Sequence, residues 1–181
     1  MLRRLCPALV GVLLLGACTS GPDPEAEPSA APSHAAGVRD GVAALYAGED
    51  DLSPEEVDES TCFADALLRR LAPGDLEAAG IVTDGAVATV LPVLDETTAR
   101  AWVAAQGECV DFVEVSTRAL GAQSKGRVDA ASYAGCLRAA LSADELDAAQ
   151  VSTLTGRFDT PEVTALAQAQ ADCAREAAPP E

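Results

Sequence analysis

One cysteine-bearing pattern occurs twice in this chain, and the repeat constrains its fold more than any other feature. "CFADALLRRL", which begins at Cys62, reads like "CLRAAL", which begins at Cys136. "DETTARAWVAAQGEC", which ends at Cys109, reads like "DTPEVTALAQAQADC", which ends at Cys173. Between them, "LAPGDLEAAGI" matches "LSADELDAAQV". Alanine-rich helices resemble one another by chance, but cysteines, glutamines and acids in the same register favour an internal duplication.

Apolar residues recur at helical spacing, with little strand alternation, and this predicts an all-α fold. We expect a disulfide-stapled helical bundle over 38–176, made of two tandem, related multi-helix halves at 38–109 and 112–173, with a disordered tail at 177–181. The expected helices span about 38–47, 53–71, 73–80, 95–109, 111–121, 130–141, 143–154 and 161–176. Four of them have start signals. Ser53-Pro54-Glu56, Ser142-Glu145 and Thr160-Pro161 are polar caps followed by a capping-box acid or a proline, and Asp95 is a cap alone.

The first residues are typical of a signal peptide. Arg3 and Arg4 form a positive start, and Leu5 to Leu15 is an apolar segment too short to span a bilayer as a helix. We therefore expect residues 1–17 to be removed on export.

The predicted signal peptide ends in Leu15-Gly16-Ala17 and is followed by Cys18, and this stretch is similar to the lipobox of bacterial lipoproteins. The resemblance implies that the sulfur of Cys18 receives a diacylglyceryl group, that palmitate is among the acyl chains, and that cleavage leaves Cys18 first in the mature protein. The alternative is an ordinary secretory signal cut near Ala17, which would leave Cys18 as a free thiol. Acyl chains anchor a protein to a membrane without spanning it.

Residues 18–37 are predicted to be the lipidated cysteine and a disordered tether rich in proline and alanine. His34, the only histidine, lies in this tether, where we expect it to be solvated. Lys125 is the only lysine beside eleven arginines, a bias typical of a GC-rich genome. The predicted location is therefore extracytoplasmic, lipid-anchored to the outer face of the cell membrane of a Gram-positive type of envelope.

The charge balance limits the possible partners. Loss of Arg3 and Arg4 from the 12 basic residues leaves 10 against 29 acidic ones, a formal charge of −19. Nucleic acids and anionic lipid surfaces attract basic surfaces, so we expect no nucleic-acid partner and contact with the membrane through the lipid anchor alone.

Four cysteines remain once the leader is removed and the lipobox cysteine is acylated, and an even set in an oxidising compartment predicts disulfides. The repeat favours Cys62 with Cys109 and Cys136 with Cys173. Pairing across the halves, Cys62 with Cys173 and Cys109 with Cys136, is the alternative. A zinc site is a rival use, but the sequence has no CxxC pair and no helper histidine, so we expect no metal and no cofactor.

Each repeat ends in a helix that carries its cysteine on an apolar stripe. Trp102 lies on the first of these stripes, which predicts a core position. Gln106 and Gln170 occupy equivalent positions on the two stripes. Their amides could hydrogen-bond to each other, or they could mark the edge of the buried face, and we favour the edge.

Few residues carry catalytic potential. The only histidine, His34, lies in the predicted tether, so we expect no Ser–His–Asp or Cys–His catalytic set. The sequence also has no glycine-rich phosphate loop. The acids at 49–51 and 55–59 could serve glycoside hydrolysis or bind calcium, but they sit at a helix start where acids favour the dipole. They also lack the spacing of an EF-hand. We do not expect an enzyme.

Residues 38–176 resemble uncharacterised secreted or lipid-anchored helical proteins of high-GC Gram-positive bacteria. The shared motif is Cys62, Leu71, Leu76, Ala79-Gly80-Ile81 and Glu108-Cys109. The second copy departs from it, since Gln150 stands where the first has Gly80. This family brings no known activity.

The sequence therefore predicts a non-catalytic interaction or structural module of the envelope, with an unknown envelope protein as its partner. A carrier that holds a small apolar ligand in a groove between the two halves is the alternative. A hydrolase that uses paired carboxylates is the least favoured reading.

The lipid anchor is testable on the protein recovered from its native envelope. We expect intact-mass and peptide analysis to find the mature chain beginning at an acylated Cys18. Recovery of unacylated, freely diffusing protein would contradict the predicted location.

Overall fold

Eight helices and one short hairpin make up the described part of the chain, residues 32–48 and 52–179, in this computed structural model. The elements are α1 (Pro32–Ala47), α2 (Pro54–Arg70), α3 (Pro73–Ala78), β1 (Val82–Thr83), β2 (Ala86–Val87), α4 (Glu96–Cys109), α5 (Phe112–Ser124), α6 (Ala130–Ala140), α7 (Ala143–Leu154) and α8 (Pro161–Glu176). The all-α prediction is confirmed. No described helix combines the length and the hydropathy needed to cross a membrane. Predictions about the signal peptide, Cys18, the tether up to residue 31 and the acids at 49–51 lie outside the described residues.

Two capping boxes begin helices as predicted. The Ser53 hydroxyl accepts a hydrogen bond from the Glu56 N–H at 3.3 Å, and the Glu56 carboxylate accepts one from the Ser53 N–H at 2.8 Å. Ser142 and Glu145 repeat both distances at the start of α7. Each box satisfies two backbone donors that the first helical turn leaves without partners.

The chain is ordered further at both ends of the domain than the sequence predicted. Helix α1 begins at Pro32 rather than near Val38, so 32–37 are helical and not part of a disordered tether. Proline suits the first helical position because its fixed φ matches the helix and its missing N–H has no partner there. Ala177, expected in the disordered tail, is 5% exposed, and its carbonyl accepts a hydrogen bond from the Asp129 N–H at 2.9 Å.

The hairpin β1–β2 was not predicted. Asp84 and Gly85 both have positive φ, 52° and 78°, as the type I′ turn of a two-residue hairpin requires. Val82 pairs with Val87, and the hairpin packs on α1. Gly41 permits this approach, since a Cβ at that position would lie 2.6 Å from a methyl carbon of Val87.

Buried side chains form two separate clusters. The first cluster joins α1 to α4 and the hairpin, and Phe63 lies at its centre between Tyr46 and Trp102, with ring centroids 4.0 and 4.6 Å away. The second joins α5 to α8 and includes Tyr133 and Leu137, both 2% exposed or less. Each half of the chain therefore has its own core.

Each core has its own disulfide. Cys62–Cys109 links α2 to α4 across 47 residues, and Cys136–Cys173 links α6 to α8 across 37. The pairing within halves is confirmed, and it uses the sulfurs that a zinc site or cross-half pairing would need. That the halves are related stays a prediction, because α3 is half the length of α7 and residues 112–179 contain no hairpin.

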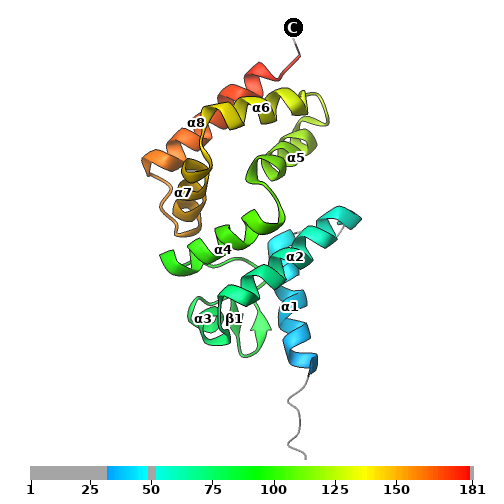
Figure 1. The fold of residues 1–181 in the computed structure, drawn as a ribbon, viewed down its shortest axis with the longest axis vertical. Helices are drawn as coiled ribbons and strands as arrows, with labels where there is room; N and C mark the ends of the chain where they lie inside the picture. The colour runs from blue at the N-terminus through cyan, green and yellow to red at the C-terminus, as the bar shows by residue number, and fades with distance from the viewer. Residues whose placement is uncertain (1–31, 49–51, 180–181) are drawn as a thin grey trace, which may run out of the picture. The chain divides into compact units, whose positions relative to one another are not determined.

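The halves meet mainly where α7 packs on α4 (Figure 1). Val151 of α7 belongs to the first core, and the Leu94 N–H donates to the Leu154 carbonyl at 2.9 Å. Helix α5 packs on α6, α6 on α8, α8 on α7 and α7 on α4. These five helices thus follow one another around a ring in Figure 1.

Removing either disulfide should weaken mainly its own half. We expect Cys62→Ala/Cys109→Ala and Cys136→Ala/Cys173→Ala each to lower the free energy of unfolding by about 4 kcal/mol, because each bridge closes a long loop in the unfolded chain. Urea unfolding measures the loss.

Hydrogen exchange distinguishes the halves, and each double variant is the control for the other. Loss of Cys136–Cys173 should speed amide exchange in α5–α8 more than in α1–α4, and loss of Cys62–Cys109 should do the reverse. The same helices loosening in both variants would contradict two separate cores.

Candidate functional site

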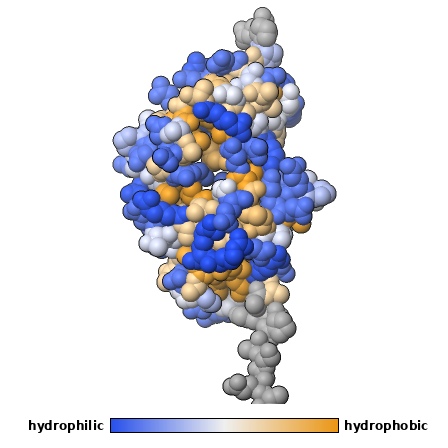
Figure 2. Space-filling view, in the orientation of Figure 1, coloured by the Kyte–Doolittle hydropathy of each residue, from blue (hydrophilic) through white to orange (hydrophobic). Residues whose placement is uncertain are grey.

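A pocket of about 370 Å³ lies where the two halves meet, and we call it the inter-half pocket. It is bordered by α4, the first residue of α5, α7, the loop after α7, and α8. Its lining residues are Trp102, Gln106, Phe112, Gln150, Thr153, Leu154, Phe158, Val163, Leu166, Ala167 and Gln170. Figure 2 shows a hollow beside α4 with hydrophobic side chains around it.

The two predicted apolar stripes supply much of this lining. On α4, Trp102 and Gln106 lie one turn apart and face the same side. On α8, Leu166 and Gln170 repeat this spacing. Trp102 is 5% exposed and belongs to the first core, as predicted, so the pocket borders that core directly.

The two glutamines do not hydrogen-bond to each other. Gln170 donates from its amide nitrogen to the Ser116 hydroxyl at 3.1 Å, and Ser116 is 2.8 Å from the hydroxyl of buried Tyr133. Among the described residues, the Gln106 amide has no hydrogen-bond partner. Both side chains are partly buried, which agrees with the edge position that the sequence favoured.

A third glutamine, Gln150, reaches the pocket from α7. Its amide nitrogen lies 3.4 Å from the Leu146 carbonyl of its own helix, beyond the usual range for a strong N–H···O bond. Three amides on three helices therefore border one apolar space, and each retains hydrogen-bonding capacity.

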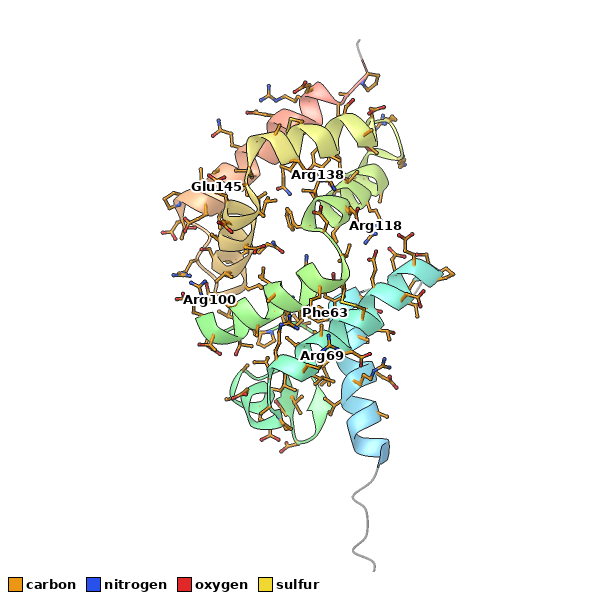
Figure 3. The ribbon with its side chains drawn as sticks, in the orientation of Figure 1. Phe63, Arg69, Arg100, Arg118, Arg138 and Glu145 are labelled. Carbon is orange, nitrogen blue, oxygen red and sulfur yellow. A yellow bond between two sulfur atoms is a disulfide. The ribbon has the colours of Figure 1, made fainter. Side chains whose placement is uncertain are left out.

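A larger pocket of about 560 Å³ shares Trp102 and Gln106 with the inter-half pocket but is charged. Arg118 of α5, labelled in Figure 3, donates to both carboxylate oxygens of Glu59 of α2, at 2.7 and 2.5 Å. The Glu59 side chain is only 14% exposed, and its hydrogen bond raises the pKa of Arg118. This partly buried ion pair links the two halves on the side away from α7.

Glu56, another of the acids singled out by sequence, caps the start of its own helix. Glu56 accepts two hydrogen bonds from Ser53, which lower its pKa, whereas a general acid for glycoside hydrolysis needs a raised one. Asp147, which lines another pocket, was not singled out by sequence. Its pKa is raised, mainly by burial and to a smaller extent by the charge of Asp144. Within the described residues, no group of three or more His, Cys, Asp or Glu side chains is placed to hold a metal ion.

Sequence reasoning found part of this site. Trp102, Gln106 and Gln170 were singled out, and the disulfide cysteines, although outside the lining, fix the helices that carry it. Phe112, Gln150 and Phe158 were missed. Phe158 could have been singled out from the sequence, because it is an aromatic residue in the short loop between two predicted helices.

No family model, no curated protein and no solved structure matches the chain. Any proposal about a ligand must therefore rest on the lining of the pocket.

Tyr46, which lines the charged pocket, should titrate far above an ordinary tyrosine. Burial, and next the charge of Glu59, raise its pKa from 10.0 to about 12. The neutral phenol is favoured in the folded state, so its contribution to stability is complete below pH 10 and is lost as the pH rises through about 12. Phenolate absorbance after a rapid pH jump, taken as wild type minus Tyr46→Phe, measures this step. A midpoint near 10 in the folded protein would contradict the described burial, and the unfolded chain is the control.

Proposed function

We propose that this protein is a cell-surface lipoprotein, anchored to the outer face of the membrane, whose helical domain binds a small apolar molecule in the inter-half pocket. The single observation that carries the proposal is the pocket itself. Its volume of about 370 Å³ falls within the range of small-molecule sites. Its lining is mostly aliphatic and aromatic with a few polar groups, which is also typical of such sites.

The surroundings of the pocket support a binding role. Helices α4 and α8 supply most of its wall, and each is tied by a disulfide to a neighbouring helix at its last turn. A site on cross-linked helices loses little freedom when a ligand enters, and this preorganisation favours affinity. The lipobox resemblance of residues 15–18 supports the location.

A second candidate, an interaction module of the envelope, has one observation in its favour. Val90, Val93 and Phe158 are 78%, 72% and 66% exposed, unusual for large apolar side chains. The loop that carries the valines is held to the end of α7 by the hydrogen bond from Leu94 to Leu154. Failure of the pocket to bind any apolar probe would favour this candidate.

N-phenyl-1-naphthylamine, a neutral fluorescent probe, tests the pocket. We expect the unacylated mature chain, which keeps every described residue, to bind it with a dissociation constant on the order of 100 µM. This follows from about −0.3 kcal/mol for each of about 17 non-hydrogen atoms. Trp102 is the only tryptophan, so probe emission excited through it reports binding near it, and the variants below identify the pocket. The probe is kept at trace concentration while the protein is titrated.

Two matched variants locate the bound probe. Ala167→Phe places a large side chain in the pocket and should weaken binding about tenfold or more, whereas Ala165→Phe, on the same helix but outside the lining, should leave it unchanged. No energy transfer at millimolar protein, or equal effects of both variants, would refute the proposed site.

A further inference from the structure

We propose that the ligand of the inter-half pocket is uncharged and carries a hydrogen-bonding group, such as a carboxamide or a hydroxyl, on an otherwise apolar body. The residues that recognise this group are Gln106 of α4 and Gln170 of α8. The inference rests on the proposed function and names the class of molecule that the pocket accepts.

The lining excludes a charged ligand. None of the eleven lining residues is ionisable, although charged residues make up 23% of the chain. Moving an ion from water into such a site is unfavourable unless an opposite charge awaits it. The neighbouring charged pocket is different, but its Arg118 is already paired with the Glu59 carboxylate through two hydrogen bonds. An anion therefore meets, at the border of the two pockets, an arginine that is already paired with a carboxylate. No residue of the inter-half lining is a carboxylate that could pair with a cation.

The amides of the lining also favour a ligand that carries a polar group. The Gln106 amide bonds to no other described residue, so its oxygen and both of its N–H groups can serve a ligand. Gln170 commits one N–H to Ser116, and its amide oxygen is left to accept. A purely hydrocarbon ligand would cover these amides without replacing the hydrogen bonds that they make to water.

Gln170 is the better positioned of the two. Its hydrogen bond to Ser116 continues to the hydroxyl of Tyr133, which is 2% exposed in the second core. These hydrogen bonds hold the amide nitrogen in place, and the Gln170 side chain lines the pocket. Gln106 stands on the other half, next to Trp102. The two amides thus approach the pocket from both disulfide-linked halves.

A matched series of naphthalenes tests the inference by displacement of N-phenyl-1-naphthylamine from the unacylated mature chain. Its members are 1-naphthaleneacetamide, which is neutral and polar, 1-ethylnaphthalene, which is neutral and apolar, 1-naphthaleneacetate and 1-naphthylmethylammonium. The amide should displace the probe about three- to tenfold more effectively than the hydrocarbon, the gain expected from one or two hydrogen bonds at a partly buried site. Both ions should be weaker than the amide by about tenfold or more.

Glutamine variants connect the preference to its residues. Gln106→Leu and Gln170→Leu should retain the probe yet lose the advantage of the amide over the hydrocarbon. Gln168→Leu, an exposed position of α8 outside the lining, should keep that advantage. Gln106→Lys should reverse the charge preference, so that the acetate displaces the probe better than the amide.

The outcomes separate this inference from the proposed function. If the probe binds but the acetate or the ammonium competes as well as the amide, the pocket is a ligand site and the inference is wrong. Equal displacement by the amide and the hydrocarbon in wild type would also overturn it. If the probe does not bind at all, the proposed function itself fails.

Discussion

Two sulfur cross-links hold together a protein whose cores are small. The second core packs around Tyr133, and the alanines Ala149 and Ala177 are among its buried members. An alanine methyl removes little apolar area from water, so helix packing contributes little per residue against the entropy of the unfolded chain. A cross-link worth about 4 kcal/mol is then a large share of a total stability of about 5–15 kcal/mol. The positions of the helices, and of everything on them, depend on these bonds.

The inter-half pocket is a consequence of building two cores instead of one. Each half buries most of its apolar side chains against its own helices, and from the second half Val151 enters the first core and Leu154 packs against it. The halves therefore touch along α4 and α7 and through the Arg118–Glu59 pair, without interdigitating along their whole length. Space remains between them, lined by the outer edges of the same stripes. Alanines such as Ala167 leave that space open because they have no side chain long enough to fill it.

Local signals were sufficient for helices with marked ends, such as the one that Ser53 caps. The start of α1 at Pro32 was missed because its first turns carry no apolar stripe. The turn at Asp84-Gly85 is a hairpin signal, but strands of two residues are too short for alternation to be seen. In the site, Gln106 stood out through the repeat. That it shares a pocket with Phe158 depends on how α7 packs on α4, and no local pattern encodes such a long-range contact.

The roles of the acidic residues explain why the polar groups available at the inter-half pocket are amides. Asp95, Asp129 and Glu145 accept hydrogen bonds at helix starts, and these bonds lower the pKa of each carboxyl group. A carboxylate held in this way stays ionised and bound to its own helix, where it stabilises the fold and has little capacity left for a ligand. Arg118 is likewise paired with a carboxylate, that of Glu59. At the inter-half pocket the polar groups with capacity to spare are neutral, and a neutral ligand is what they suit.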